Sequence, residues 1–141
     1  MRTAWLGGAR AAGRTFALFE RPAAPQDCET AAIWLAEHAY DRFGATKLAI
    51  GGFSAGATLA AATLLRLRDR GISAVDAAVL QFGTYDLSAL TPAGRLIADE
   101  YFLEAYTEAA CDRTHPDLSP IYADLVDLPP VLGSGTRSCQ A

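Results

Sequence analysis

The sequence has no surplus of positive charge, no long apolar run and little cysteine. Its formal net charge is −4 and its pI is about 5.0, which argues against nucleic acid as a partner because nucleic-acid-binding domains usually carry a basic surface. No stretch approaches the roughly 20 apolar residues of a membrane span, so we expect no membrane partner. The three cysteines, Cys28, Cys111 and Cys139, lack metal-ligand spacing. They predict reduced thiols, a cytoplasmic location and no bound metal.

The length and composition are those of one domain or part of one. At 141 residues and 51% hydrophobic, the chain can bury a single sizeable core. Residues 1–14 are rich in Ala, Gly and Arg, but their apolar portion is too short for a secretory signal. We therefore expect a partly disordered leader at 1–14, a core at 15–133 and a polar tail at 134–141.

Short apolar runs alternate with amphipathic segments along the core. This alternation predicts an α/β fold with a mostly parallel sheet, right-handed crossovers and helices on both faces. The expected strands are 15–20, 47–52, 75–82 and one beginning near Pro130, and the expected helices are 25–43, 55–70 and one or two within 92–106. The helical segment at 92–106 fits either a lid over the site or an ordinary surface helix.

The stretch at 47–59 carries the main chemical signal. Gly52, Ser54 and Gly56 fit the pattern G-x-S-x-G between an expected strand and an expected helix, which is the nucleophile elbow that exposes a serine hydroxyl above a parallel sheet. We expect glycine at both flanking positions because a Cβ at either would collide where strand and helix approach. The alternative is an ordinary Gly-Ser turn in another α/β protein.

Several segments together resemble the middle of an α/β-hydrolase esterase of the hormone-sensitive lipase type. The likeness runs from about Thr15 to Leu132 and rests on the order and spacing of its pieces, above all on G-G-F-S-A-G-A-T-L-A-A-A. The other pieces are E-R-P-A-A-P, D-C-E-T-A-A-I-W-L-A-E-H-A, L-R-D-R-G, A-A-V-L-Q-F-G-T-Y-D-L-S, D-L-S-P and L-P-P-V-L. The resemblance implies a partial α/β-hydrolase fold and a serine carboxylic-ester hydrolase acting on small-molecule esters without a cofactor, with Ser54 as nucleophile.

An elbow serine needs partners for catalysis. A histidine must take its proton, an acid must orient that histidine, and backbone N–H groups must stabilise the oxyanion. The residue after the nucleophile, here Ala55, supplies one such N–H. The second donor normally comes from an H-G-G-G segment, of which Leu6-Gly7-Gly8-Ala9 is only a distant echo without the histidine.

The family's acid and histidine have no counterparts in this sequence. Where a G-T-x-D segment is expected, Gly135-Thr136 is followed by Arg137-Ser138. Asp86 and His115 have the right order to substitute, whereas His38 precedes the elbow and is expected to face solvent or cap a helix.

Three interpretations stay open: an esterase, a catalytically inactive α/β-hydrolase-like fragment or binding protein, and, with less support, a peptidase. If the strand near Pro130 is the last of the sheet, its exposed edge would permit self-association.

Overall fold

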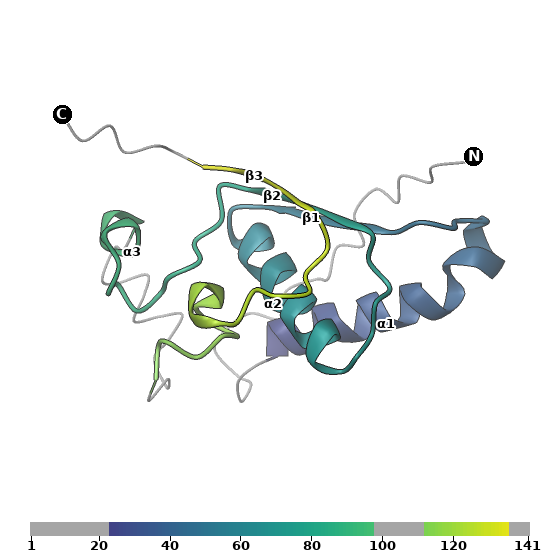
Figure 1. Cartoon of the computed structure of the whole chain (residues 1–141), viewed down its shortest axis with the longest axis horizontal. Helices are drawn as coiled ribbons and strands as arrows, with labels where there is room; N and C mark the ends of the chain where they lie inside the picture. Colours follow the sequence, from purple (N-terminus) through teal and green to yellow (C-terminus); the bar gives the residue numbers. More distant parts are fainter. Residues whose placement is uncertain (1–22, 98–111, 136–141) are drawn as a thin grey trace.

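Three short strands form one parallel sheet in the computed structural model, which describes residues 23–97 and 112–135 (Figure 1). The strand order is β1 (Ala49–Phe53), β2 (Ala77–Gln81), β3 (Val131–Ser134). Gly51 pairs with Val79, and Val79 pairs with Leu132 in the next strand. The predicted α/β class with a parallel sheet and flanking helices is therefore confirmed.

Helix α2 (Ala55–Asp69) connects β1 to β2 and packs on the sheet. Its small residues allow this close approach: Ala57, Ala60 and Leu64 form a buried cluster with Ala78 and Leu80 of β2. The helix is buried on more than one side, because Thr63 and Leu65 are also buried without belonging to that cluster. Burial on two sides indicates that α2 lies between the sheet and a second layer.

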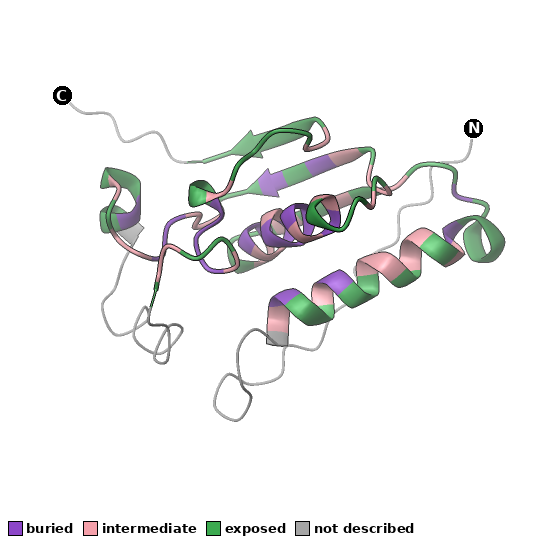
Figure 2. Ribbon diagram, turned by 60° about the horizontal axis from the view of Figure 1, so that its bottom comes forward, coloured by how far each residue is buried: buried purple, intermediate pink, exposed green. Residues whose placement is uncertain are grey.

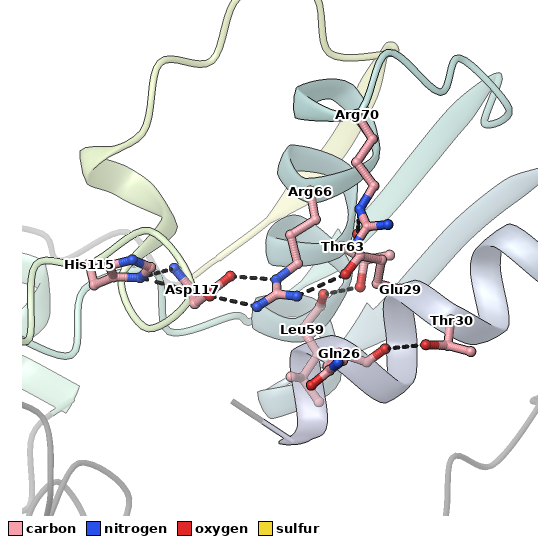
Figure 3. Close-up of polar contacts among 9 residues, drawn as sticks. All are labelled: Gln26, Glu29, Thr30, Leu59, Thr63, Arg66, Arg70, His115 and Asp117. Carbon is pink, nitrogen blue, oxygen red and sulfur yellow. Dashed lines mark hydrogen bonds and ion pairs between the residues drawn. The ribbon is translucent and has the colours of Figure 1, made fainter. Parts of the chain in front are cut away.

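Helix α1 (Ala23–Phe43) forms that second layer (Figure 1). It packs against α2 and lies on the same side of the sheet as α2. An ion-pair cluster joins the two helices to a following turn (Figure 3). Arg66 of α2 binds Glu29 of α1 at 2.8 Å and both carboxylate oxygens of Asp117 at 2.6 and 2.7 Å. Arg70 Nε lies 2.5 Å from Glu29 Oε1, at an angle that leaves this oxygen without a well-formed hydrogen bond.

The remaining described elements are short. Helix α3 (Pro92–Ile97) and the 3-10 turn η1 (Pro120–Tyr122) follow β2 and precede β3. The structure contains the strands expected at 47–52 and 75–82 and the helices expected at 25–43 and 55–70, with bounds shifted by a few residues. Strand β3 includes Ser134, so the polar tail expected at 134–141 begins later than predicted. The strand expected at 15–20, the leader at 1–14 and most of the expected helix at 92–106 lie outside the described residues.

The helices that the structure describes lie on one face of the sheet, and the expectation of helices on its other face falls outside the described residues. Figure 2 shows buried and exposed residues alternating along β2 and only exposed residues in β3. Helix α1 does not supply a second covering layer because it packs on α2 instead.

Candidate active site

Ser54 lies at a sharp turn between β1 and α2, as the elbow pattern predicts. Its backbone has φ 54° and ψ −123°, a conformation that a residue with a side chain adopts only at an energetic cost. The turn is held because the Ser54 N–H donates to the carbonyl of Gln81 at 2.8 Å. The Ser54 carbonyl in turn accepts the N–H groups of Ala57 at 2.9 Å and Thr58 at 3.3 Å. Bonds to both β2 and α2 therefore fix the strained residue in place.

The Ser54 side chain does not cap the helix that follows it. A serine preceding a helix normally accepts a hydrogen bond from an N–H of the first turn. Here the Ser54 hydroxyl makes no such capping bond, and the residue is exposed. The strained backbone thus presents to solvent a hydroxyl that has no hydrogen-bond partner among residues 23–97 and 112–135.

Ala55 occupies the first position of α2, directly after the serine. The first N–H groups of a helix have no intrahelical acceptor, and they lie at the positive end of the helix dipole. An oxygen bearing negative charge next to Ser54 would meet this N–H. This is the position at which the sequence pattern predicts one donor of an oxyanion site.

The two glycines of the elbow are not equivalent. A Cβ on Gly52 would overlap the backbone of Gly56 and Ala57, so no larger residue fits there. A Cβ on Gly56 would meet no atom within 4 Å among the described residues. The expectation of a collision at Gly56 is therefore wrong for the described residues, because a Cβ at Gly52 would enter the first turn of α2 whereas one at Gly56 would meet open space.

A threonine pair ties the first turn of α2 to the loop after β2. Thr58 Oγ1 donates to the carbonyl of Thr84 at 2.8 Å and accepts the Thr84 N–H at 3.1 Å. Nearby, the rings of Phe53 and Phe82 contact each other with centroids 5.6 Å apart. No motif in the sequence indicates these contacts. The one signal is that both segments follow neighbouring strands, whose ends meet at one edge of a parallel sheet.

Asp86 follows β2, but its carboxylate is already occupied. It is buried and accepts hydrogen bonds from the N–H and hydroxyl of Ser88 at 2.9 and 2.5 Å and from those of Thr91 at 2.8 and 2.7 Å. Burial alone would raise the pKa of Asp86, but these bonds outweigh it and lower the pKa to about 2. Asp86 therefore fastens the loop after β2.

His115 contacts Asp117 rather than the elbow. Its Nδ1 accepts the Asp117 N–H at 3.3 Å and lies 3.8 Å from the Asp117 carboxylate. Asp117 is bound to Arg66, which lies 12 positions after Ser54, or about 18 Å along a helix at 1.5 Å per residue. Figure 3 shows His115, Asp117 and Arg66 together. The structure thus does not bring Ser54, Asp86 and His115 together as a triad.

The other histidine is also engaged elsewhere. His38 Nδ1 lies 2.7 Å from the carbonyl of Trp34, and the two rings stack at a centroid distance of 4.6 Å. Because the sequence contains two histidines, both are accounted for away from Ser54.

Within residues 23–97 and 112–135 no three His, Cys, Asp or Glu side chains are grouped to hold a metal ion. No helix in the same ranges is long and apolar enough to cross a bilayer.

Comparison with known proteins matches this arrangement to esterases. The carboxylic ester hydrolase LipN of Mycobacterium tuberculosis is 33% identical over 128 residues, which cover 79% of this chain and 34% of the relative. The solved hyperthermophilic esterase from Pyrobaculum calidifontis is 34% identical with a TM-score of 0.71, over 81% of this chain and 42% of the other.

A further solved structure connects the chain to the predicted subgroup. Brefeldin A esterase, a bacterial homologue of human hormone-sensitive lipase, has a TM-score of 0.71 and 25% identity over 89% of this chain and 40% of its own. The chain thus spans between about one third and two fifths of the length of these relatives. The predicted resemblance to the hormone-sensitive lipase type is confirmed. Residues 19–135 match the family described as the alpha/beta hydrolase fold, and the protein belongs to that family.

Proposed function

We propose that the protein is a serine carboxylic-ester hydrolase for small-molecule esters, with Ser54 as nucleophile and the Ala55 N–H as an oxyanion donor. The observation that carries this proposal is the strained, exposed serine whose hydroxyl caps no helix. Strain of this kind persists only where surrounding contacts maintain it, and it gathers at functional sites. The esterase relatives support the same reaction class.

In the proposed reaction the Ser54 hydroxyl oxygen attacks the ester carbonyl carbon while a base takes its proton. The tetrahedral oxyanion receives a hydrogen bond from the Ala55 N–H, and collapse expels the alcohol and leaves an acyl-serine that water hydrolyses. Neither His38 nor His115 contacts Ser54. The described residues therefore supply the nucleophile and one donor, and the base is the component that the experiment must find.

A second candidate function is favoured by the engagement of both histidines elsewhere. A hydrolase fold without a base would bind small esters or related molecules near Ser54 without turning them over. Removing the base from a serine hydrolase leaves only the activity due to binding and the oxyanion site. This alternative predicts a folded protein in which Ser54 is unreactive.

Labelling with a fluorophosphonate probe separates the two candidates. We expect the purified wild-type chain to be labelled and to hydrolyse short p-nitrophenyl esters, and both signals to vanish in Ser54→Ala. Ser73→Ala is the matched control, because Ser73 is an exposed serine in the loop after the carboxyl end of α2, whereas Ser54 precedes its amino end. His115→Ala and His38→Ala test each histidine as the base. A folded wild-type chain that is not labelled would refute the esterase and leave the non-catalytic candidate.

We also propose a cytoplasmic location and self-association through the exposed part of the sheet. Cys28 is a free thiol in the structure, and burial, with a smaller effect of Asp27, raises its pKa. A protonated, half-buried thiol is compatible with a reducing compartment.

All four residues of β3 are exposed, which supports self-association at this side of the sheet.

A further inference from the structure

The hydroxyl of Thr58 bonds away from its own helix. A threonine inside a helix can donate to the carbonyl four residues earlier, and Thr30 of α1 and Thr63 of α2 do so at 2.8 and 2.7 Å. Thr58, which lies four residues after Ser54, departs from this pattern. Its Oγ1 donates to the Thr84 carbonyl at 2.8 Å and accepts the Thr84 N–H at 3.1 Å. One side chain therefore holds both backbone polar groups of a residue 26 positions later in the chain.

The bonds of Thr58 and Ser54 together close a ring. The Ser54 N–H donates to the carbonyl of Gln81 at 2.8 Å, and the chain then runs from Gln81 to Thr84. Thr84 is bound to the Thr58 hydroxyl, and the Thr58 N–H donates to the Ser54 carbonyl at 3.3 Å. The ring thus joins the end of β1, the first turn of α2 and the loop after β2.

Two residues of this ring have a left-handed backbone. Phe53 pairs with Gln81 at the ends of β1 and β2, so Ser54 and Phe82 are the next residues on adjacent strands. Their φ angles are 54° and 53°, a region that residues other than glycine enter only at an energetic cost. Such conformations persist where the surrounding structure over-determines them. The ring supplies contacts before and after each of the two strained residues.

The bonds of Thr58 are shielded from water. Thr58 is 6% exposed, and Thr84 is half-buried. Valine has nearly the shape of threonine without the hydroxyl, so Thr58→Val would leave the N–H and the carbonyl of Thr84 without this partner. A buried polar group that loses its partner costs more than the bond itself contributed. The loop after β2 would regain partners by shifting away from α2, and the ring around Ser54 would open.

We propose that Thr58 is a positioning residue for the elbow. Its hydroxyl fixes the first turn of α2 to the loop after β2, and thereby holds the Ser54 side chain and the Ala55 N–H in the orientation that attack on an ester requires. Thr58 acts through these two residues and takes no part in the chemical step. The effect on reactivity rests on the esterase function proposed above, whereas the effect on the Ser54 backbone does not depend on activity.

The variants Thr58→Val and Thr58→Ser test the hydroxyl. Thr63→Val is the matched control, because Thr63 is also buried on α2 but donates to Leu59 of the same helix. We expect Thr58→Val to lower the rate of fluorophosphonate labelling and kcat for p-nitrophenyl acetate about 10-fold or more, as for two lost hydrogen bonds, with little change in KM. Thr58→Ser should restore both rates to within about 3-fold of the wild type, and Thr63→Val should leave both near the wild-type values.

Amide hydrogen exchange, resolved by residue with NMR, measures the elbow without requiring activity. In Thr58→Val the Ser54 amide should exchange about 10-fold or more faster relative to the amides in the second half of α2. Thr58→Ser and Thr63→Val should leave this ratio near that of the wild type. The ratio separates a local release of the elbow from a general loss of stability, which would speed exchange along the whole helix.

The proposal fails if a labelled wild type is matched in rate by Thr58→Val, or if the Ser54 exchange ratio is the same in both. Equal changes in Thr58→Val and Thr63→Val would also overturn it, because they would show that the hydroxyl of Thr58 contributes to stability alone. A folded wild-type chain that is not labelled would refute the esterase function, and the Ser54 exchange ratio would then decide by itself whether Thr58 holds the elbow.

Discussion

Replacing Arg66 with methionine should destabilise the protein more than any other single change of a charged side chain on α2. The guanidinium of Arg66 binds carboxylates from two other parts of the chain, Glu29 and Asp117. Methionine keeps most of the apolar stem, so the variant chiefly removes the charge and its hydrogen bonds. Loss of Arg66 would leave Asp117 without its bidentate partner and Glu29, whose side chain is 3% exposed, with one cation instead of two.

The expected cost is about 2–3 kcal/mol of unfolding free energy. Removing one partner of a fully buried ion pair typically costs about 3–5 kcal/mol. The side chain of Arg66 is 21% exposed, and Glu29 retains Arg70, so solvent and the remaining cation lower the value. Arg70→Met is the control because it removes the same charge from the residue that directly follows α2, but at a side chain that is 60% exposed. An exposed pair contributes about 0–1 kcal/mol.

Urea denaturation followed by far-UV circular dichroism measures both variants under one condition. The reasoning requires the transition midpoint of Arg66→Met to fall well below that of Arg70→Met. The double variant Glu29→Gln with Arg66→Met should lose less stability than the sum of the two single losses. The reason is that Glu29→Gln removes a carboxylate that Arg66→Met has left short of cations. Equal midpoints for Arg66→Met and Arg70→Met would refute the view that this cluster joins the two helices.

Three further outcomes are expected. Gly52→Ala should cost several kcal/mol in thermal unfolding, whereas Gly56→Ala should be neutral or stabilising by up to about 1 kcal/mol; equal losses would contradict the geometry. Ser54→Gly should abolish probe labelling yet raise stability by about 1 kcal/mol, since glycine adopts a positive φ without strain. The pKa of Asp86 is lowered from its ordinary value to about 2. Its carboxylate therefore stabilises the folded protein by about 2 kcal/mol above about pH 4, and this contribution is lost as the pH falls toward 2. Asp86→Asn should remove this part of the acid dependence when the unfolding free energy is measured against pH.

The sheet and its crossover helix could be predicted because their signals are local. The apolar run before Gly51 and Gly52 marks β1, and the alanine-rich segment after Ser54 marks a helix that must pack closely on the sheet. A parallel sheet follows from the single helix between consecutive strands. The same local reasoning located the elbow, although the direction of each missing Cβ required coordinates.

The side on which α1 packs and the ion-pair cluster could not be predicted. Hydrophobic periodicity identifies a buried helix face but not the element that covers it, so the placement of both long helices on one side was not foreseen. Arg66 meets residues 37 and 51 positions away in the chain, and no sequence spacing encodes such pairs. The loop bonds of Asp86 are local, and the segment D-L-S is a pattern in which an aspartate often binds the N–H two residues on.

The burial of α2 on two sides also determines the order in which the protein opens. Amides of a helix enclosed between a sheet and another helix exchange with solvent only when the whole unit unfolds, whereas those of an exposed edge strand such as β3 exchange through local opening. Ser54 is attached directly to α2, so the elbow belongs to the slowest-exchanging part of the chain. Partial heating should therefore release β3 while the strained serine is still held in its turn.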